Sequence, residues 1–237
     1  MQKKFELNCD MGEGIGNEHL LMPLIDSCSI ACGGHAGDDD TMKQTIELAL
    51  KYKVSIGAHP SFPDKANFGR KKLNMDRGAL MESLNNQVSH FESLCLQQGA
   101  ALSHIKTHGA LYNLAAVDVK MAQTVIDALQ SYLYLSFVAP GHSVFQKLIH
   151  AAGGSIKTEA FADRSYHPDL TLVSRDDPNG VITNPEKAME QVKEMVINQR
   201  VRSISGSYVP ITAETFCVHG DNPSAMKVLQ ALRNLLI

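Results

Sequence analysis

Short apolar runs of strand length alternate with segments of helical periodicity along this chain, and this alternation constrains the fold more than any other feature. The runs are Lys3–Cys9, Ser27–Cys32, Val54–Ala58, Ser103–Thr107, Leu133–Ala139, Ser155–Ala160 and Glu214–Val218. Strands that alternate with helices pair in parallel through right-handed crossovers. Seven such units predict a distorted seven-stranded (β/α) TIM-like barrel of the α/β class, one unit short of the usual eight. An open, doubly wound sheet is the alternative.

Apolar periodicity and capping residues predict where the helices lie. The periodic segments are Thr41–Lys53, Asp76–Gln98, Asp118–Gln130 and His142–Ala152. Asn184-Pro185 and Asn222-Pro223 each have the pattern of an N-cap followed by proline at the first helical position. The segment Arg164–Gly180 lacks periodicity, so we interpret it as a functional loop or lid. Because no linker or repeat divides the chain, we expect residues 1–237 to form a single domain.

The charge balance and the cysteines limit the partners and the compartment. With 22 Lys+Arg against 25 Asp+Glu, the formal net charge is −3, which does not supply the basic face that nucleic-acid binding requires. No window approaches the roughly 18 apolar residues of a membrane span, and we expect no secretory signal. The five cysteines are odd in number and scattered, which indicates reduced thiols and a cytoplasmic protein.

Titratable residues beside glycine or proline follow nearly every predicted strand. They are Asp10 and Glu13, His35, His59, Lys106 and His108, His142, Arg164, and His219 with Asp221. In parallel α/β folds the carboxyl ends of the strands carry the active site, and glycine lets the backbone approach a ligand closely. The pattern therefore predicts one active site at this end of a barrel. We expect the other histidines, His19, His90, His104, His150 and His167, to be surface or hydrogen-bonded residues.

The types of residue at the strand ends indicate hydrolysis. The chain has no G-x-S-x-G nucleophile elbow and no G-x-x-x-x-G-K-[ST] nucleotide loop, which disfavours acyl-serine chemistry and a standard nucleotide cradle. A carboxylate can activate water, imidazoles or Lys106 can stabilise an oxyanion, and Arg164 or Arg175 can hold an anionic group. The same Asp and His residues could instead hold a divalent metal ion that activates water.

Several of these segments together resemble a known family. They are Leu7–Gly14, Ile30–Asp38, Ile56–Asp64, Phe68–Arg70, Lys106–Asn113, Phe161–Tyr166 and Val218–Pro223. In this order they resemble the family of 5-oxoprolinase A-subunits, also called the LamB/YcsF lactam-utilisation family, over essentially the whole chain. Three positions depart from the family pattern: Gly34 stands in place of an aromatic residue, Thr107 in place of proline and Leu170 in place of glycine.

The resemblance implies a barrel related to the glycoside hydrolase/deacetylase fold and an ATP-dependent cleavage of 5-oxo-L-proline to L-glutamate with two partner subunits. ATP would be bound through the partners, which would phosphorylate the lactam carbonyl, and this chain would hydrolyse the activated lactam. Asp10 is then the expected general base, with Glu13 as the second carboxylate. His35, His59, Lys106 and His108 would position water or stabilise the oxyanion, and Arg164, Arg175, His219 and Asp221 would bind the substrate.

Two other functions remain open at this point. The first is a stand-alone metal-dependent deacetylase or amidohydrolase, with Asp10, His35 and His59 as the metal ligands. The second is a non-catalytic subunit that only channels substrate to its partners, which explains the cationic residues but not the many histidines at strand ends. The sequence leaves open whether a metal is bound and whether the chain forms a homo-oligomer.

Overall fold

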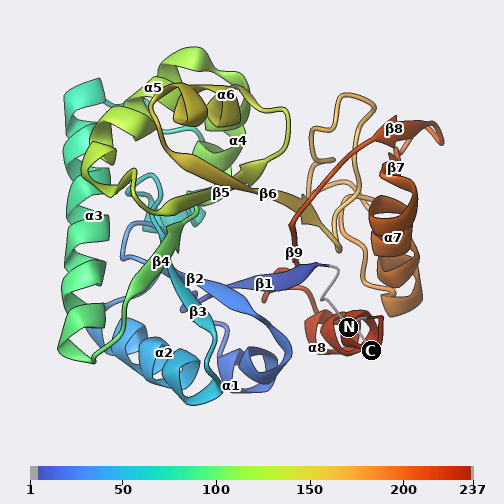
Figure 1. Ribbon diagram of the computed structural model, residues 1–237, viewed down its shortest axis with the longest axis horizontal. Helices are drawn as coiled ribbons and strands as arrows, with labels where there is room; N and C mark the ends of the chain where they lie inside the picture. The colour runs from blue at the N-terminus through green and yellow to red at the C-terminus, as the bar shows by residue number, and fades with distance from the viewer. Residues whose placement is uncertain (1–4, 236–237) are drawn as a thin grey trace.

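The computed structural model describes residues 5–235, in which parallel strands close into a barrel (Figure 1). The seven barrel strands, in their order around the barrel, are β1 (Glu6–Met11), β2 (Ser27–Ala31), β3 (Ser55–His59), β4 (Leu102–Ile105), β5 (Ser136–Pro140), β6 (Ser155–Phe161) and β9 (Thr215–Cys217). Strand β9 closes the barrel by pairing with both β6 and β1. The seven-stranded barrel is confirmed and the open-sheet alternative is wrong; of the first predicted strand, residues 3–4 lie outside the described residues.

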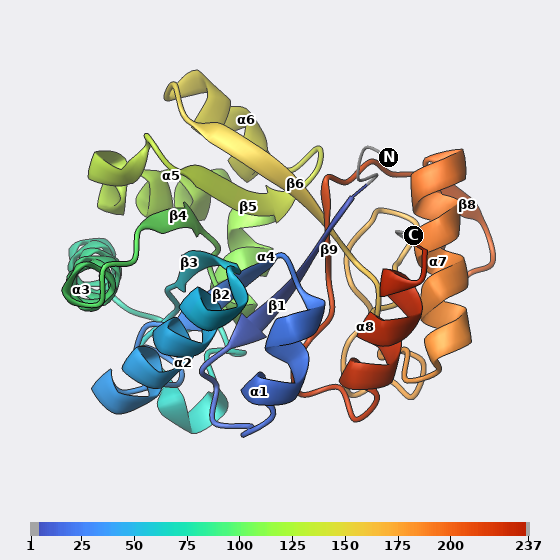
Figure 2. The same cartoon turned by 60° about the horizontal axis from the view of Figure 1, so that its bottom comes forward.

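Helices cover the outside of the barrel (Figure 1). They are α1 (Glu18–Leu21), α2 (Asp39–Tyr52), α3 (Arg77–Gln97), α4 (Gly109–Val117), α5 (Val119–Ala128), α6 (Val144–Ala151), α7 (Pro185–Asn198) and α8 (Ala225–Arg233). Five of them begin after a side chain that accepts a hydrogen bond from a first-turn amide, a capping arrangement that stabilises a helix start. The four periodic segments and the Asn184-Pro185 start are therefore confirmed. Figure 2 shows α8 beside α1 on the outside of β1.

The prediction for Asn222-Pro223 is wrong, because α8 begins two residues later, at Ala225. Asn222 is buried, and its amide nitrogen donates to Asp163 Oδ2 at 3.1 Å and to the Ile182 carbonyl at 3.0 Å. Its side-chain oxygen accepts from the Ser224 amide instead of capping a helix that starts at Pro223. Asn222 thus stabilises a loop of the barrel end.

The short helix α1, helix α4 and a β-hairpin have no counterpart among the predictions. Helix α4 (Gly109–Val117) is apolar on most sides, so it lacks the polar stripe that reveals a surface helix. Strands β7 (Arg200–Arg202) and β8 (Tyr208–Pro210) form a separate antiparallel hairpin outside the barrel. Both are too short to show a period of two clearly in the sequence.

The segment Arg164–Gly180 is a loop, as predicted, and it is anchored rather than free. Isolated bridges join Arg164 to Val181 and Tyr166 to Leu172. The Tyr166 hydroxyl also accepts a hydrogen bond from the Phe161 amide at 2.7 Å. Leu170, where the family pattern predicts glycine, has the left-handed φ of 67° that glycine adopts more easily.

The surroundings of Gly34 explain why no aromatic residue stands there. A Cβ atom at Gly34 would lie 2.4 Å from Gln87 Oε1, so the Gln87 side chain fills the space that an aromatic residue would need. The five cysteines are buried free thiols, in agreement with the reduced thiols expected from their odd number and scattered positions. Between residues 5 and 235, no helix has the length and apolar character needed to cross a membrane.

Candidate active site

A cavity of about 470 Å³ opens at the carboxyl ends of the barrel strands. The predicted site residues that line it are Asp10 from β1, Glu13, His59 from β3, Lys106 and His108 after β4, Arg164, Arg175 and His219. His35 and Asp221 do not line the cavity themselves, but each forms a hydrogen bond with a residue that does: His35 with Glu13, and Asp221 with Arg175. The fold therefore brings the predicted residues together, although Asp10 and His219 are 209 positions apart in the sequence. This happens because the carboxyl ends of parallel strands meet at one end of a barrel.

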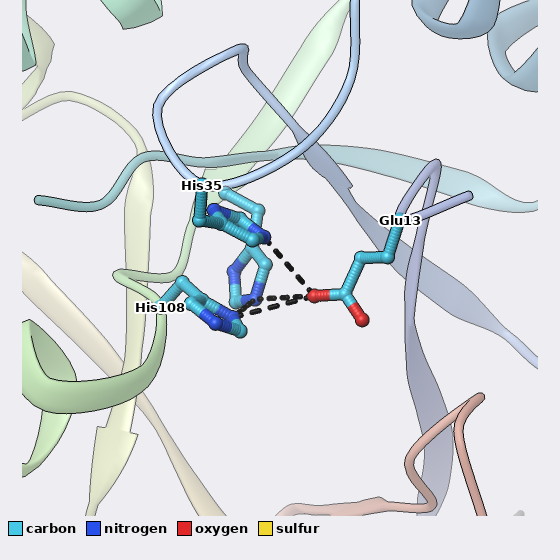
Figure 3. Close-up of side chains that lie close together, drawn as sticks. Glu13, His35 and His108 are labelled. Carbon is cyan, nitrogen blue, oxygen red and sulfur yellow. Dashed lines mark hydrogen bonds and ion pairs between the residues drawn. The ribbon is translucent and has the colours of Figure 1, made fainter. Parts of the chain in front are cut away.

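Three histidines surround the Glu13 carboxylate (Figure 3). Glu13 Oε1 lies 3.1 Å from His35 Nε2, 3.3 Å from His108 Nδ1 and 3.9 Å from His59 Nε2. The rings of His35 and His108 are stacked, with centroids 3.6 Å apart. These four residues, which we call the histidine–Glu13 cluster, are almost completely shielded from solvent.

The outer nitrogen of each ring is held by a hydrogen bond. His59 Nδ1 lies 2.7 Å from the Lys106 carbonyl oxygen, and His108 Nε2 lies 2.9 Å from the Phe68 carbonyl oxygen. Because a carbonyl only accepts, both nitrogens carry hydrogen. His35 Nδ1 lies 3.0 Å from Ser61 Oγ, whose own hydrogen is donated to the Phe62 carbonyl. In the neutral rings the three inner nitrogens are therefore lone-pair acceptors.

Burial and neighbouring charges shift the pKa of each histidine. Burial lowers the pKa of His35, and burial together with the charges of His59 and His35 lowers the pKa of His108 well below its usual value. Burial also opposes the charged form of His59, but the Asp10 carboxylate, 3.4 Å from His59 Nε2, outweighs it and raises the His59 pKa. The cluster thus combines neutral imidazoles with one ring that Asp10 favours as a cation.

Asp10 lies between His59 and a buried lysine. Lys106 Nζ donates to Asp10 Oδ1 at 2.9 Å and lies 2.8 Å from Glu159 Oε1. Burial alone would raise the pKa of Asp10, but the charges of His59 and Lys106 hold it well below its usual value. The Lys106 side chain is only 3% exposed; burial would lower its pKa, yet the Asp10 and Glu159 carboxylates keep it well above its usual value. Lys106 is therefore a charged residue that orients Asp10.

His219 is oriented by a buried carboxylate that the sequence prediction missed. His219 Nδ1 and its backbone amide both donate to Asp163, at 2.9 Å and 3.0 Å. Burial opposes ionisation of Asp163, but the charge and hydrogen bonds of His219 lower its pKa. Because Nδ1 is bound to Asp163, the Nε2 nitrogen of His219 is the one available on the cavity side.

Arginines lie at the rim of the cavity, and each is hydrogen-bonded to a group of the protein itself. Arg175 bonds both carboxylate oxygens of Asp221, and Arg70 bonds the same carboxylate at 2.5 Å. Asp221 thus positions two guanidinium groups and is not itself free to bind substrate. Arg164 is buried, and it donates to the carbonyls of Gly180 and Val173, so it also anchors the 164–180 loop. Burial and Arg175 lower the pKa of Arg164 to about 10.

Some residues were missed, and some histidines lie elsewhere. His142 is exposed at the start of α6, and among the described residues it does not line the cavity. His104 is buried between Ser29 and Ser103, as expected of a hydrogen-bonded histidine. The missed site residues are Ser61, Arg70, Glu159 and Asp163. Ser61, Arg70 and Asp163 lie within segments that resemble the family, and Glu159 lies at the end of a predicted strand. A buried carboxylate near a strand end is the signal that indicates Glu159 and Asp163.

Within residues 5–235, two groups of side chains have the composition of a metal site. One is the histidine–Glu13 cluster; the other is Asp10, Cys217 and His219. In the second group Lys106 Nζ already lies 2.9 Å from Asp10 and 3.3 Å from Cys217 Sγ, so its ammonium supplies the positive charge there. Of the three metal ligands predicted from the sequence, His35 and His59 belong to the first group, whereas Asp10 pairs with Lys106. The other two members of the first group are Glu13 and His108.

A closed parallel barrel with its titratable residues gathered at the carboxyl ends of the strands places this chain among the TIM-like α/β barrel proteins. Comparison with known proteins narrows the class. The chain belongs to the LamB/YcsF family, which matches residues 5–237. It is 40% identical, over 99% of its length and 92% of the relative's, to a protein from Symbiobacterium thermophilum that is named as the A-subunit of 5-oxoprolinase.

Solved structures with a similar fold include one of a lactam utilization protein. A lactam utilization protein from Thermus thermophilus superimposes with a TM-score of 0.89 at 31% identity, covering 98% of this chain and 95% of that one. A GH18 chitinase from Pseudoalteromonas aurantia has a TM-score of 0.51 at 9% identity, covering 96% and 100% of the two chains. The second likeness concerns the fold alone: a glycoside hydrolase barrel has a similar arrangement of strands and helices.

Proposed function

We propose that this chain is the hydrolytic subunit of a cytoplasmic, ATP-dependent 5-oxoprolinase that converts 5-oxo-L-proline to L-glutamate together with two partner subunits. The observation that carries the proposal is the 40% identity, over almost the whole chain, to a relative named as the A-subunit of 5-oxoprolinase. The site supports the chemistry, because it holds carboxylates, imidazoles and an arginine rim around one cavity. ATP is used by the partners, which phosphorylate the lactam oxygen.

The reaction of this chain then begins with the phosphorylated lactam. One water molecule attacks the activated carbonyl carbon, and the ring C–N bond breaks to give an acyl phosphate and a free amine. A second water molecule then attacks the same carbon, and the bond to the phosphorylated oxygen breaks. The products are glutamate and inorganic phosphate. Opening an unactivated lactam is unfavourable, and phosphorylation supplies the leaving group that drives it. The chain must therefore bind an anion, activate water and protonate the departing ring nitrogen.

Asp10 is assigned as the general base. Its carboxylate is ionised at neutral pH, because His59 and Lys106 outweigh the effect of burial on its pKa. Lys106 Nζ, 2.9 Å from Asp10 Oδ1, and His59 hold this carboxylate in place to accept a proton from the attacking water. His59 Nε2, 3.4 Å from Asp10 Oδ2, helps to position the attacking water beside that carboxylate.

The remaining residues bind the substrate and protonate the leaving group. Arg70 and Arg175, held together by Asp221, face the cavity and bind the substrate carboxylate or phosphate. His219, oriented by Asp163, presents Nε2 to the cavity and donates the proton to the ring nitrogen. Arg164 shapes the loop that covers these groups.

The test is ATP-dependent release of glutamate from 5-oxoproline by the purified chain alone, by the partner subunits alone and by the three together. Glutamate is expected only from the complete mixture. Release by the lone chain would remove the need for partners, and release by the partners alone would remove this chain from the reaction. Equal turnover by a complex that carries the His35→Ala/His108→Ala double variant would favour a non-catalytic channelling subunit.

A further inference from the structure

We propose that Glu13, His35, His59 and His108 bind one divalent transition-metal ion of the zinc type. The four side chains offer three imidazole nitrogens and one carboxylate oxygen, all within 4.8 Å of one another. This is the ligand set that Zn²⁺ and its neighbours in the first transition row prefer. The binding claim concerns this chain alone and does not depend on the proposed lactam hydrolysis.

The spacing of the ligand atoms fits one ion. Zinc bonds of 2.0–2.2 Å to nitrogen and oxygen place tetrahedral ligands roughly 3.3–3.5 Å apart. The contacts are 3.0 Å between His59 Nε2 and His108 Nδ1, 3.1 Å between Glu13 Oε1 and His35 Nε2, and 3.3 Å between Glu13 Oε1 and His108 Nδ1. The parallel rings of His35 and His108 must tilt apart for both lone pairs to reach the same ion.

The hydrogen-bond pattern requires a cation or a proton at the centre of the cluster. His59 and His108 donate their outer N–H groups to backbone carbonyls, so in the neutral rings their inner lone pairs face each other at 3.0 Å. Two lone pairs repel at that distance unless a positive species lies between them. Glu13 adds a buried negative charge, and within residues 5–235 no lysine or arginine pairs with it. A metal ion satisfies all four groups at once.

The outer hydrogen bonds are themselves typical of metal-binding histidines. A ligating histidine usually donates its other N–H to a carbonyl, hydroxyl or carboxylate, which fixes the tautomer and orients the ring. Here the partners are the Lys106 carbonyl for His59, the Phe68 carbonyl for His108 and Ser61 for His35. If such an ion took a fifth ligand, it would supply Lewis-acid polarisation to an oxygen atom beside Asp10.

The closing experiment measures binding without substrate, ATP or partner subunits. The purified chain is stripped with a chelator, and Zn²⁺ and Co²⁺ are titrated in by equilibrium dialysis with metal analysis. We expect one ion per chain, a visible Co²⁺ absorption band of a low-coordinate nitrogen–oxygen site, and a higher Tm with Zn²⁺. Failure to bind either metal at a stoichiometric ratio would overturn the proposal while leaving the lactam hydrolysis to be judged by its own assay.

Variants locate the ion. His59→Ala/His108→Ala should abolish binding. The control His90→Ala/His150→Ala removes two exposed histidines outside the cluster and should keep it. Ser61→Ala, which removes only the partner of His35 Nδ1, should weaken binding about 10–100-fold. Glu13→Gln, an isosteric change, should weaken it further and serves as the ligand test if the double variant fails to fold.

Two results would contradict the assignment. One is unchanged stoichiometry and affinity in a folded Glu13→Gln or double-histidine variant. The other is loss of the ion in Cys217→Ser with the histidine variants unaffected, since this would place the metal at Asp10, Cys217 and His219 instead.

Discussion

Removing the positive charge of Lys106 should destabilise the fold far more than removing an exposed lysine. Lys106 Nζ lies 2.9 Å from Asp10 and 2.8 Å from Glu159, and its side chain is 3% exposed. Lys106→Met leaves two buried carboxylates without their cation, and breaking one side of a buried ion pair costs about 3–5 kcal/mol. For a domain of this size 1 kcal/mol corresponds to about 2–4 °C, so the Tm should fall by roughly 6–20 °C.

The matched control is Lys157→Met. Lys157 forms an ion pair of similar length, 2.7 Å, with Glu6, but both side chains are about one-third exposed. Exposed pairs contribute about 0–1 kcal/mol because water and salt screen them. The double variant Lys106→Met/Glu159→Gln should regain part of the stability, since it removes one of the two uncompensated carboxylates. Urea unfolding followed by circular dichroism measures all three free energies of unfolding.

The loss of stability in Lys106→Met should also depend on pH in a direction that the Asp10 pKa determines. In the wild type His59 and Lys106 outweigh burial and depress the Asp10 pKa, so this group stabilises the fold above its unfolded pKa and the stabilisation is lost as pH falls through the folded pKa. Without Lys106, Asp10 loses one of the two cations that oppose burial, so its folded pKa rises. The deficit of Lys106→Met should therefore shrink as pH falls from about 7 towards 5. A deficit below about 1 kcal/mol, or one that grows on acidification, would refute the reasoning.

Three further predictions concern the rim, a buried histidine and a helix end. Asp221→Asn releases Arg70 and Arg175 from their shared carboxylate, so KM for the activated substrate should rise about tenfold with kcat little changed; a fall in kcat alone in steady-state kinetics would contradict this. Burial lowers the pKa of His104 from its ordinary 6.5 to about 3, so below pH 6.5 the unfolded chain takes up a proton that the folded chain does not, and stability falls towards pH 3. His104→Gln should lose this component, so its Tm should change less than that of the wild type between pH 7 and 5; an equal change would show that His104 does not contribute. Gln199 ends α7 with a left-handed φ of 50° and is exposed, so Gln199→Gly should raise the free energy of unfolding by about 0.5–1 kcal/mol and Gln199→Ala should not.

The barrel was predictable because parallel strands buried on both faces are continuous apolar runs. Each predicted run overlaps a barrel strand, and β2, for example, is buried at all five positions. The capped helices were equally visible, since Asn184 followed by Pro185 has a local meaning that packing did not override. Helix α4 was missed because an apolar helix packed among its neighbours has no polar face to mark its period.

The position of the site was predictable from the strand ends, but the pairing within it was not. Glu159 reaches Lys106 from β6, 53 positions along the chain, and no local spacing encodes that contact. Arg164 was expected at the substrate because arginine binds anions, yet two backbone carbonyls of its own loop take its hydrogen bonds. Asp221 was expected to bind substrate, yet Arg70 and Arg175 use its carboxylate. These contacts depend on which side chains and backbone carbonyls the fold brings within reach, and the local sequence does not encode that.

The central claim is that this chain performs the hydrolysis, and Asp10→Asn in the reconstituted complex tests it most directly. Glutamate and ADP are measured together with the three subunits, after thermal unfolding and gel filtration show that the variant is folded and assembled. We predict that glutamate release falls about 10²–10⁴-fold, because a general base is lost. Glutamate release at the wild-type rate would contradict the account.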